Sequence, residues 1–185
     1  MLEVSNFLDQ EDLNTFVNFA NEIDKIDTAP CKKSHWEIRA DGSTLNVIRV
    51  APYKYNLMKD KYHPNVPVAL QDDLYGNLEK FWNKYCPIVE QHAKTIIGDS
   101  FDCSGFRIFL QYTDMEEDYG FHSHPLDVLV GVLYLTPEKS TGTIFRDRTL
   151  SWEVNKLVLF KGDIEHNFVN PNDAHKRFTL NFFFR

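Results

Sequence analysis

Cysteine is scarce in this chain, and its few positions follow no recognisable pattern. Cys31, Cys86 and Cys103 are the only cysteines, and no two of them have CxxC spacing. An odd and unpatterned set argues against a zinc ribbon and against a disulfide framework. We therefore expect a reducing, cytoplasmic compartment.

Long apolar runs are also missing. No stretch approaches the roughly 18 apolar residues of a membrane-spanning helix. The first residues, MLEVSNFLDQEDL, are acidic rather than basic and then apolar. We expect neither a membrane span nor a signal peptide, and no membrane partner.

Positive charge is in deficit, because the formal net charge is −7. A general nucleic-acid binder needs clustered Lys and Arg against the phosphates, so nucleic acid is not an expected partner. Hydrophobic residues make up 43% and aromatic residues 14% of the 185 residues, which is a globular composition. Without a repeat or a Gly/Ser linker, we expect one domain over 1–185. Residues 1–100 should form helical support with the first strands, and residues 101–185 a β core.

Two helices are predicted in the first half. Asp9 should cap the first, and the second should run from about Val68 to Ile97 before Gly98. Pro87 is expected to break or kink the second helix. The predicted buried faces, from three- and four-residue spacing, are Leu13, Phe16, Val17, Ala20 and Ile23, and then Leu70, Leu74, Leu78, Phe81, Trp82 and Tyr85.

Short runs of β-branched and aromatic residues dominate from Phe106 onward. Helices followed by strands indicate an α+β protein with the helices packed on one sheet face. Many short strands indicate a barrel or a sandwich. The predicted strands are Trp36–Arg39 and Leu45–Val50 around an Asp41-Gly42 turn, Phe106–Tyr112, Val128–Leu135, Thr143–Phe145, Leu157–Phe160 and Arg177–Phe184.

Three histidines in this second half form a candidate metal site. His122 and His124 precede an apolar strand, and residues two apart on a strand point to the same side. Taken alone, two surface histidines explain this pair as well as a metal does. His166 follows a buried strand and a Gly162-Asp163 turn. A lone histidine there is more often structural, but its place soon after His-x-His favours a shared metal.

The last predicted strand has two unlike faces. A buried, unpaired guanidinium is costly, so Arg177 needs a partner. That partner is either an anionic ligand, such as a carboxylate held in a bidentate fork with help from Thr179, or an acidic side chain of the protein. Tyr112 is either a core aromatic or a hydroxyl for the same ligand. The two faces are Phe178, Leu180, Phe182 and Phe184 against Arg177, Thr179, Asn181 and Phe183.

From about Phe101 to Phe184 the sequence resembles the 2-oxoglutarate/Fe(II) oxygenase superfamily, especially its prolyl-hydroxylase-like group. The resemblance implies a double-stranded β-helix, that is, a jelly-roll or cupin-like barrel with N-terminal helices on one sheet. It is closest to a little-characterised His-x-His-Pro subgroup. The matching motifs are Gln111-Tyr112, His122-Ser-His-Pro125, Gly131-Val-Leu-Tyr-Leu135, Gly142-Thr-Ile-Phe145, Arg146-Asp-Arg148, Gly162-Asp163 with His166, and Arg177-Phe-Thr179.

One position departs from the pattern of that superfamily. The usual Fe(II) site has two histidines and a carboxylate, and here His124 occupies the carboxylate's place. Three alternatives remain open: a three-histidine site of His122, His124 and His166, a site in which Asp127 replaces His124, or no native metal.

By this resemblance the chain is a dioxygenase that uses Fe(II), 2-oxoglutarate and O₂ to hydroxylate a C–H bond. His122, His124 and His166 would be the catalytic metal ligands, and Arg177, Thr179 and Tyr112 would bind 2-oxoglutarate. The substrate is a small molecule or a peptide that the sequence does not identify, and the oligomeric state is equally open. The alternatives are a cupin-type three-histidine metal dioxygenase without 2-oxoglutarate and an inactive binding domain of the same fold.

Overall fold

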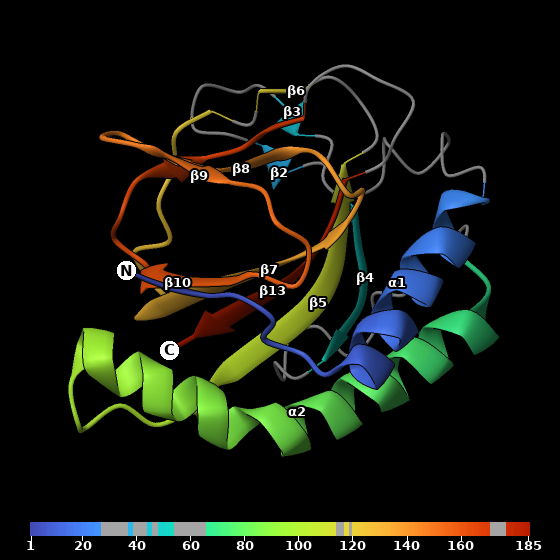
Figure 1. Ribbon diagram of the computed structural model, residues 1–185, viewed down its shortest axis with the longest axis horizontal. Helices are drawn as coiled ribbons and strands as arrows, with labels where there is room; N and C mark the ends of the chain where they lie inside the picture. Colours follow the sequence, from blue (N-terminus) through green and yellow to red (C-terminus); the bar gives the residue numbers. More distant parts are fainter. Residues whose placement is uncertain are drawn as a thin grey trace.

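The structure, a computed structural model, describes residues 1–26, 37–38, 44–45, 48–53, 66–113, 117–118, 120–170 and 177–185. Figure 1 shows two long helices against one side of an antiparallel sheet and a smaller sheet on the other side. The predicted α+β arrangement, with helices packed on one sheet, is confirmed in this form.

Six antiparallel strands form the larger sheet, in which sequence neighbours are rarely spatial neighbours. The C-terminal strand lies in the middle, between strands that come much earlier in the chain. In order across the sheet, the strands are β1 (Leu2–Val4), β10 (Leu157–Lys161), β7 (Leu129–Thr136), β13 (Arg177–Phe184), β5 (Phe106–Thr113) and β4 (Ile48–Tyr53).

The remaining strands are short. Because strands of two or three residues show no readable alternation, the sequence pattern misses β1, β6, β9, β11 and β12. The predicted Asp41-Gly42 turn lies outside the described residues. The described strands pair in four separate sheets, so a closed double-stranded β-helix stays a prediction. The smaller sheets are β11 (His166–Asn167), β8 (Thr141–Phe145) and β9 (Thr149–Ser151); β12 (Val169–Asn170) with β6 (Glu117–Asp118); and β2 (Glu37–Ile38) with β3 (Thr44–Leu45).

Helix α1 (Gln10–Asp24) begins as predicted, because the Asp9 side chain accepts a hydrogen bond from the Asp12 backbone N–H at 2.9 Å. Its buried face differs slightly from the prediction. Phe19 is buried in place of Leu13 and Val17, which are only partly covered. The buried set still follows three- and four-residue steps, so the buried stripe is rotated slightly around the helix relative to the predicted one.

Helix α2 (Val68–Ile97) continues through Pro87, so of the predicted break or kink the break is wrong. A proline removes one backbone donor, but burial of the helix face on both sides of it stabilises the continuous helix. That face includes Trp82 and Tyr85 before the proline and Val89 and Ala93 after it. Figure 1 shows α2 curving along the sheet rather than running straight. In the described part of the chain, neither helix combines the length and the apolar character that a membrane crossing requires.

Strand β13 separates the two sides of the larger sheet. Phe178, Leu180, Phe182 and Phe184 belong to the core shared with the helices. Phe81 and Trp82 of α2 contact Phe182 and Phe184, with ring centroids 5.7 Å apart in each pair. Arg177, Thr179 and Asn181 lie on the opposite side, in a cavity. The predicted register of this strand is confirmed.

Candidate metal centre

His122 and His124 lie on an extended segment that is not a regular strand, contrary to the prediction. Only His122 pairs with another strand residue, in an isolated antiparallel bridge with His166. The two backbone hydrogen bonds of this bridge measure 3.0 and 2.9 Å. The His124 N–H donates to the Gly162 carbonyl at 2.7 Å. Backbone contacts, rather than strand parity, therefore bring the histidines together.

Two of the three rings are oriented by a second hydrogen bond. His122 Nδ1 lies 3.0 Å from the Gly120 carbonyl, and His166 Nδ1 lies 3.0 Å from the Ile164 carbonyl. A carbonyl only accepts, so each Nδ1 carries a proton, and in the neutral ring the lone pair is then on Nε2. Histidines that bind metals commonly have this arrangement, because the bond fixes both the tautomer and the ring orientation.

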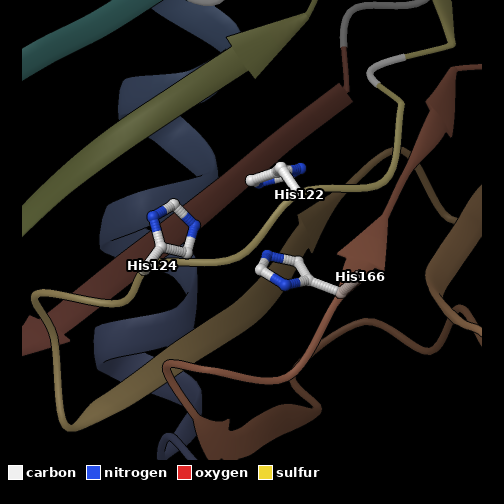
Figure 2. Close-up of side chains that lie close together, drawn as sticks. All are labelled: His122, His124 and His166. Carbon is white, nitrogen blue, oxygen red and sulfur yellow. The ribbon is translucent and has the colours of Figure 1, made fainter. Parts of the chain in front are cut away.

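The three imidazoles gather around one point (Figure 2), two from one segment and the third from β11. Ring centroids are 4.4 Å apart for His122 and His166, 5.0 Å for His122 and His124, and 5.2 Å for His124 and His166. One ligand nitrogen of each lies within 4.8 Å of the others. The group can therefore hold a divalent metal after small side-chain movements, since imidazole ligands lie about 2.0–2.1 Å from such an ion.

Burial favours the uncharged, metal-binding form of His166. Desolvation, together with the neighbouring His122, lowers the pKa of His166 to about 4. At neutral pH the His166 ring is therefore uncharged and its Nε2 is available as a ligand. Metal binding does not have to displace a proton from this residue.

Arg177 lies on the same side of the sheet and is only 2% exposed. Burial lowers the pKa of its guanidinium to about 10, so it still carries its charge at neutral pH. The rings of Trp152 and Phe168 lie 4.8 Å from its central carbon. Among the described residues, its one recorded hydrogen bond runs from Nε to the Thr141 carbonyl, at a long 3.4 Å. The protein acid proposed as an alternative partner is not found in the part of the chain that the structure describes.

The cavity that contains these residues carries no described carboxylate. Asn181 donates to the Gln111 side chain at 2.9 Å, and both amides are buried. Arg177 is therefore the only charged side chain among the described lining residues. An anion in this cavity would face a cation and hydrogen-bond donors. The lining is His122, His124, His166, Arg177, Thr179, Asn181, Gln111, Thr143, Asn167, Phe168, Phe183, Val130 and Val132.

Asp127, the alternative metal ligand, lies away from the three histidines. Its carboxylate oxygens are 3.8 Å from Arg107 and 3.7 Å from Arg185, and it is outside both the cavity lining and the histidine group. Its backbone N–H donates to the His124 carbonyl at 2.9 Å. Asp127 therefore supports the segment that carries His124. The Tyr112 side chain, predicted to reach the same ligand, lies outside the described part of the structure.

Two aromatic residues beside Arg177, Phe168 and Trp152, were not predicted from the sequence. Phe168 lies two residues after His166 in an extended segment, so strand parity could have placed it on the cavity side. Trp152 comes from the segment after β9, and its Nε1 donates to the Pro137 carbonyl at 2.7 Å. No sequence feature links Trp152 to Arg177, because only the folded chain brings them together.

No family model and no curated protein matches the sequence. Among solved structures, a prolyl-4-hydroxylase from Pseudomonas putida aligns with 100% of this chain and 91% of its own, with a TM-score of 0.52 and 12% identity. This similarity shows the fold. A cupin-2 domain protein from Shewanella frigidimarina aligns with 46% of this chain and 76% of its own, with a TM-score of 0.36 and 14% identity. An RmlC-like cupin from Desulfovibrio desulfuricans aligns with 45% of this chain and 74% of its own, with a TM-score of 0.36 and 11% identity.

Proposed function

We propose that this chain is a non-haem Fe(II), 2-oxoglutarate-dependent dioxygenase that hydroxylates a C–H bond of a small molecule or a peptide. One observation carries the proposal: a buried Arg177 shares a cavity with three converging histidines, and no described carboxylate lines that cavity. A metal alone would leave the guanidinium without an anion. A dicarboxylate that also reaches the metal would satisfy both.

The residues fit the two groups. His122, His124 and His166 would hold the metal through imidazole nitrogens, which suit Fe(II). Neutral ligands leave the metal's full positive charge in a cavity that already contains Arg177. An anionic second ligand is therefore favoured more strongly than in a site that includes a carboxylate.

Arg177 and Thr179 would bind the far carboxylate of 2-oxoglutarate. They share the cavity side of β13. Aromatic rings lie near the guanidinium, while its N–H donors lie in its plane and are suited to a bidentate acceptor. Thr179 is 1% exposed and lines the same cavity, so its hydroxyl is placed to donate to a bound carboxylate.

Fe(II) with 2-oxoglutarate and O₂ supplies the oxidation, in which the oxo acid becomes succinate and CO₂ while a substrate C–H becomes C–OH. The chain's own contribution is orientation and exclusion of water. Phe168 and Phe183 line the cavity beside the polar groups and reduce its hydration. The cytoplasmic setting inferred from the cysteines remains part of the proposal.

The test is calorimetric titration of 2-oxoglutarate into protein loaded anaerobically with Mn(II), which replaces Fe(II) without oxygen chemistry. Arg177→Ala should weaken 2-oxoglutarate binding at least about a hundredfold, since breaking a buried charge-assisted contact costs several kcal/mol. Mn(II) affinity should hardly change. Thr179→Val should weaken 2-oxoglutarate binding only about fivefold, because it removes one neutral hydrogen bond worth about 1 kcal/mol.

Arg148→Ala is the matched control, because it removes the same charge from an exposed position. It should bind 2-oxoglutarate like the wild type. If the wild type binds no 2-oxoglutarate, or if Arg177→Ala binds it equally well, the proposal fails. If the wild type binds 2-oxoglutarate and Arg177→Ala does not, turnover of 2-oxoglutarate to succinate with panels of small molecules and peptides is the search for the substrate.

The three-histidine donor set also favours a second candidate, a cupin-type metal dioxygenase that does not use 2-oxoglutarate. Such an enzyme has no need for Arg177 as an anion site. Oxidation of a substrate by the Fe(II)-loaded chain without 2-oxoglutarate, and unaffected by Arg177→Ala, would favour it.

A further inference from the structure

We propose a second metal site, for a thiophilic divalent cation such as Zn²⁺, formed by Cys86, Glu90 and Cys103. One sulfur of each cysteine and a carboxylate oxygen of Glu90 lie within 4.8 Å of one another. The site is independent of the histidines and of the proposed oxygenase function. It lies on the helix side of the larger sheet, where Cys103 belongs to the core shared with the helices.

Two elements supply the ligands. Cys86 and Glu90 are four residues apart on α2, so they share one face of the helix. Cys103 lies in the segment between α2 and β5, which Figure 1 shows turning back from the end of α2 toward the sheet. The backbone of this segment is fixed locally, since Asp102 Oδ1 accepts from the Ser104 N–H at 2.8 Å. A bound ion would fasten the end of α2 to the beginning of β5.

The donor chemistry selects the metal class. Two thiolates and one carboxylate suit a borderline-soft ion that accepts tetrahedral geometry, with the fourth position left for water. A hard ion such as Mg²⁺ would prefer oxygen ligands throughout. Cys103 is 6% exposed and Cys86 is partly buried, so the sulfur side of the site is shielded from solvent.

The charges around the sulfurs also favour a cation. Glu90 and Asp102 lie close enough to Cys103 to raise its pKa, while the ammonium of Lys94 faces Glu90 and Asp99 as well as Cys103. Lys94 lies 2.7 Å from Glu90, but this pair is about one-third exposed on each side. Ion pairs this exposed contribute little to stability, so Glu90 can exchange Lys94 for a metal at little cost. Burial raises the pKa of both thiols, so the ion displaces two protons when it binds.

Co²⁺ is the direct probe, because only thiolate ligands give a near-ultraviolet sulfur-to-cobalt charge-transfer band. The experiment uses the full chain with Cys31→Ser, kept reduced, so that Cys86 and Cys103 are the only thiols. At saturation the band should have the intensity of one sulfur-ligated Co²⁺ per chain, and Zn²⁺ should remove it. The histidine site contributes no sulfur band, so the two sites are distinguished in one titration.

Cys103→Ala and Cys86→Ala should each weaken Zn²⁺ binding at this site at least about a hundredfold and reduce or remove the band. Glu90→Gln should weaken it about tenfold, while Glu79→Gln, the same charge change on the exposed face of α2, should have no effect. In the Cys31→Ser chain, Zn²⁺ should raise the melting temperature more than it does after Cys86→Ala, in which only the histidine site remains. Cys86 is chosen because it is the more exposed of the two cysteines.

Two outcomes would overturn the proposal. One is a reduced chain with both thiols intact and no sulfur-to-cobalt band. The other is a band that keeps its full intensity in both cysteine variants.

Discussion

At the scale of single residues, burial decides which cavity groups are charged. His166 is uncharged because desolvation and His122 lower its pKa from 6.5 to about 4. Arg177 is even more deeply buried but keeps its charge, because the unperturbed pKa of a guanidinium is so high. The same physical cause thus yields a metal ligand at one position and an anion site at the other.

The His166 shift predicts a pH-dependent stability. The unfolded chain binds a proton at this residue below pH 6.5, and the metal-free folded chain only near pH 4. Stability from His166 is therefore complete above pH 6.5 and lost as the pH falls toward 4. The loss should reach at most about 3 kcal/mol, from 1.36 kcal/mol per pKa unit. Urea unfolding in EDTA between pH 7 and pH 4.5 measures it.

His166→Gln should flatten this pH dependence, because glutamine does not titrate. His92→Gln removes a histidine from α2 instead and leaves the His166 contribution in place. An equally steep loss of stability in the His166→Gln chain would mean that other groups cause it.

The placement of single residues in the cavity could be predicted where the order of motifs along the chain indicated it. The three histidines and Arg177 were found from motif order, and the structure gathers all four around one cavity. Asp127 shows the limit of such reasoning. Its distance from His122 in sequence allowed it to be a ligand, but Arg107 and Arg185 lie near its carboxylate in the fold. Such pairings between distant positions cannot be read from one sequence.

At the scale of elements, long alternating segments were predictable and short ones were not. β13 was predicted with its observed bounds, because alternation over eight residues separates the helix side from the cavity side. β11 has only two residues, and it is held by pairing with β8 rather than by its own sequence. The His122–His166 bridge depends on such local pairing, which is why the strand predicted for His-x-His is replaced by an extended segment.

The turn after β10 sets the position of His124. A Cβ on Gly162 would lie 1.8 Å from the Asp127 carbonyl oxygen and 2.6 Å from that of His124. Gly162→Ala should therefore displace the His124 segment and weaken metal binding at least about tenfold, as loss of an orienting contact does. Mn(II) titration of the variant, with its circular dichroism compared with the wild type, tests this.

Gly76→Ala provides the matched control. A Cβ at Gly76 would meet no atom within 4 Å, and the residue lies inside α2. This change should stabilise the chain by about 0.5–1 kcal/mol through helix propensity and leave metal affinity unchanged. If Gly162→Ala binds Mn(II) as tightly as Gly76→Ala does, the turn does not position His124.

At the scale of the whole molecule, the candidate ligands come from different layers. His166 belongs to the three-stranded sheet and Arg177 to the six-stranded sheet, while His122 and His124 lie on the segment that leads into β7. A metal with a bound dicarboxylate would therefore connect two sheets that, among the described strands, share no strand pairing. Ligand binding should stabilise the entire fold rather than a single loop, because it favours only the folded chain.

This connection predicts two successive increases in stability, the first from the metal and the second from 2-oxoglutarate. Mn(II) at a hundred times its dissociation constant should add about 2.7 kcal/mol, or roughly 5–10 °C in melting temperature for a chain of this size. A further increase from 2-oxoglutarate should require both the metal and Arg177. One end of 2-oxoglutarate would bind the metal, and the carboxylate at the other end would bind Arg177. Thermal melts of the wild type and of Arg177→Ala, with Mn(II), 2-oxoglutarate or both, measure the two gains separately. Equal 2-oxoglutarate gains in the two chains, or a gain without metal, would show that the dicarboxylate does not bridge the histidines and Arg177.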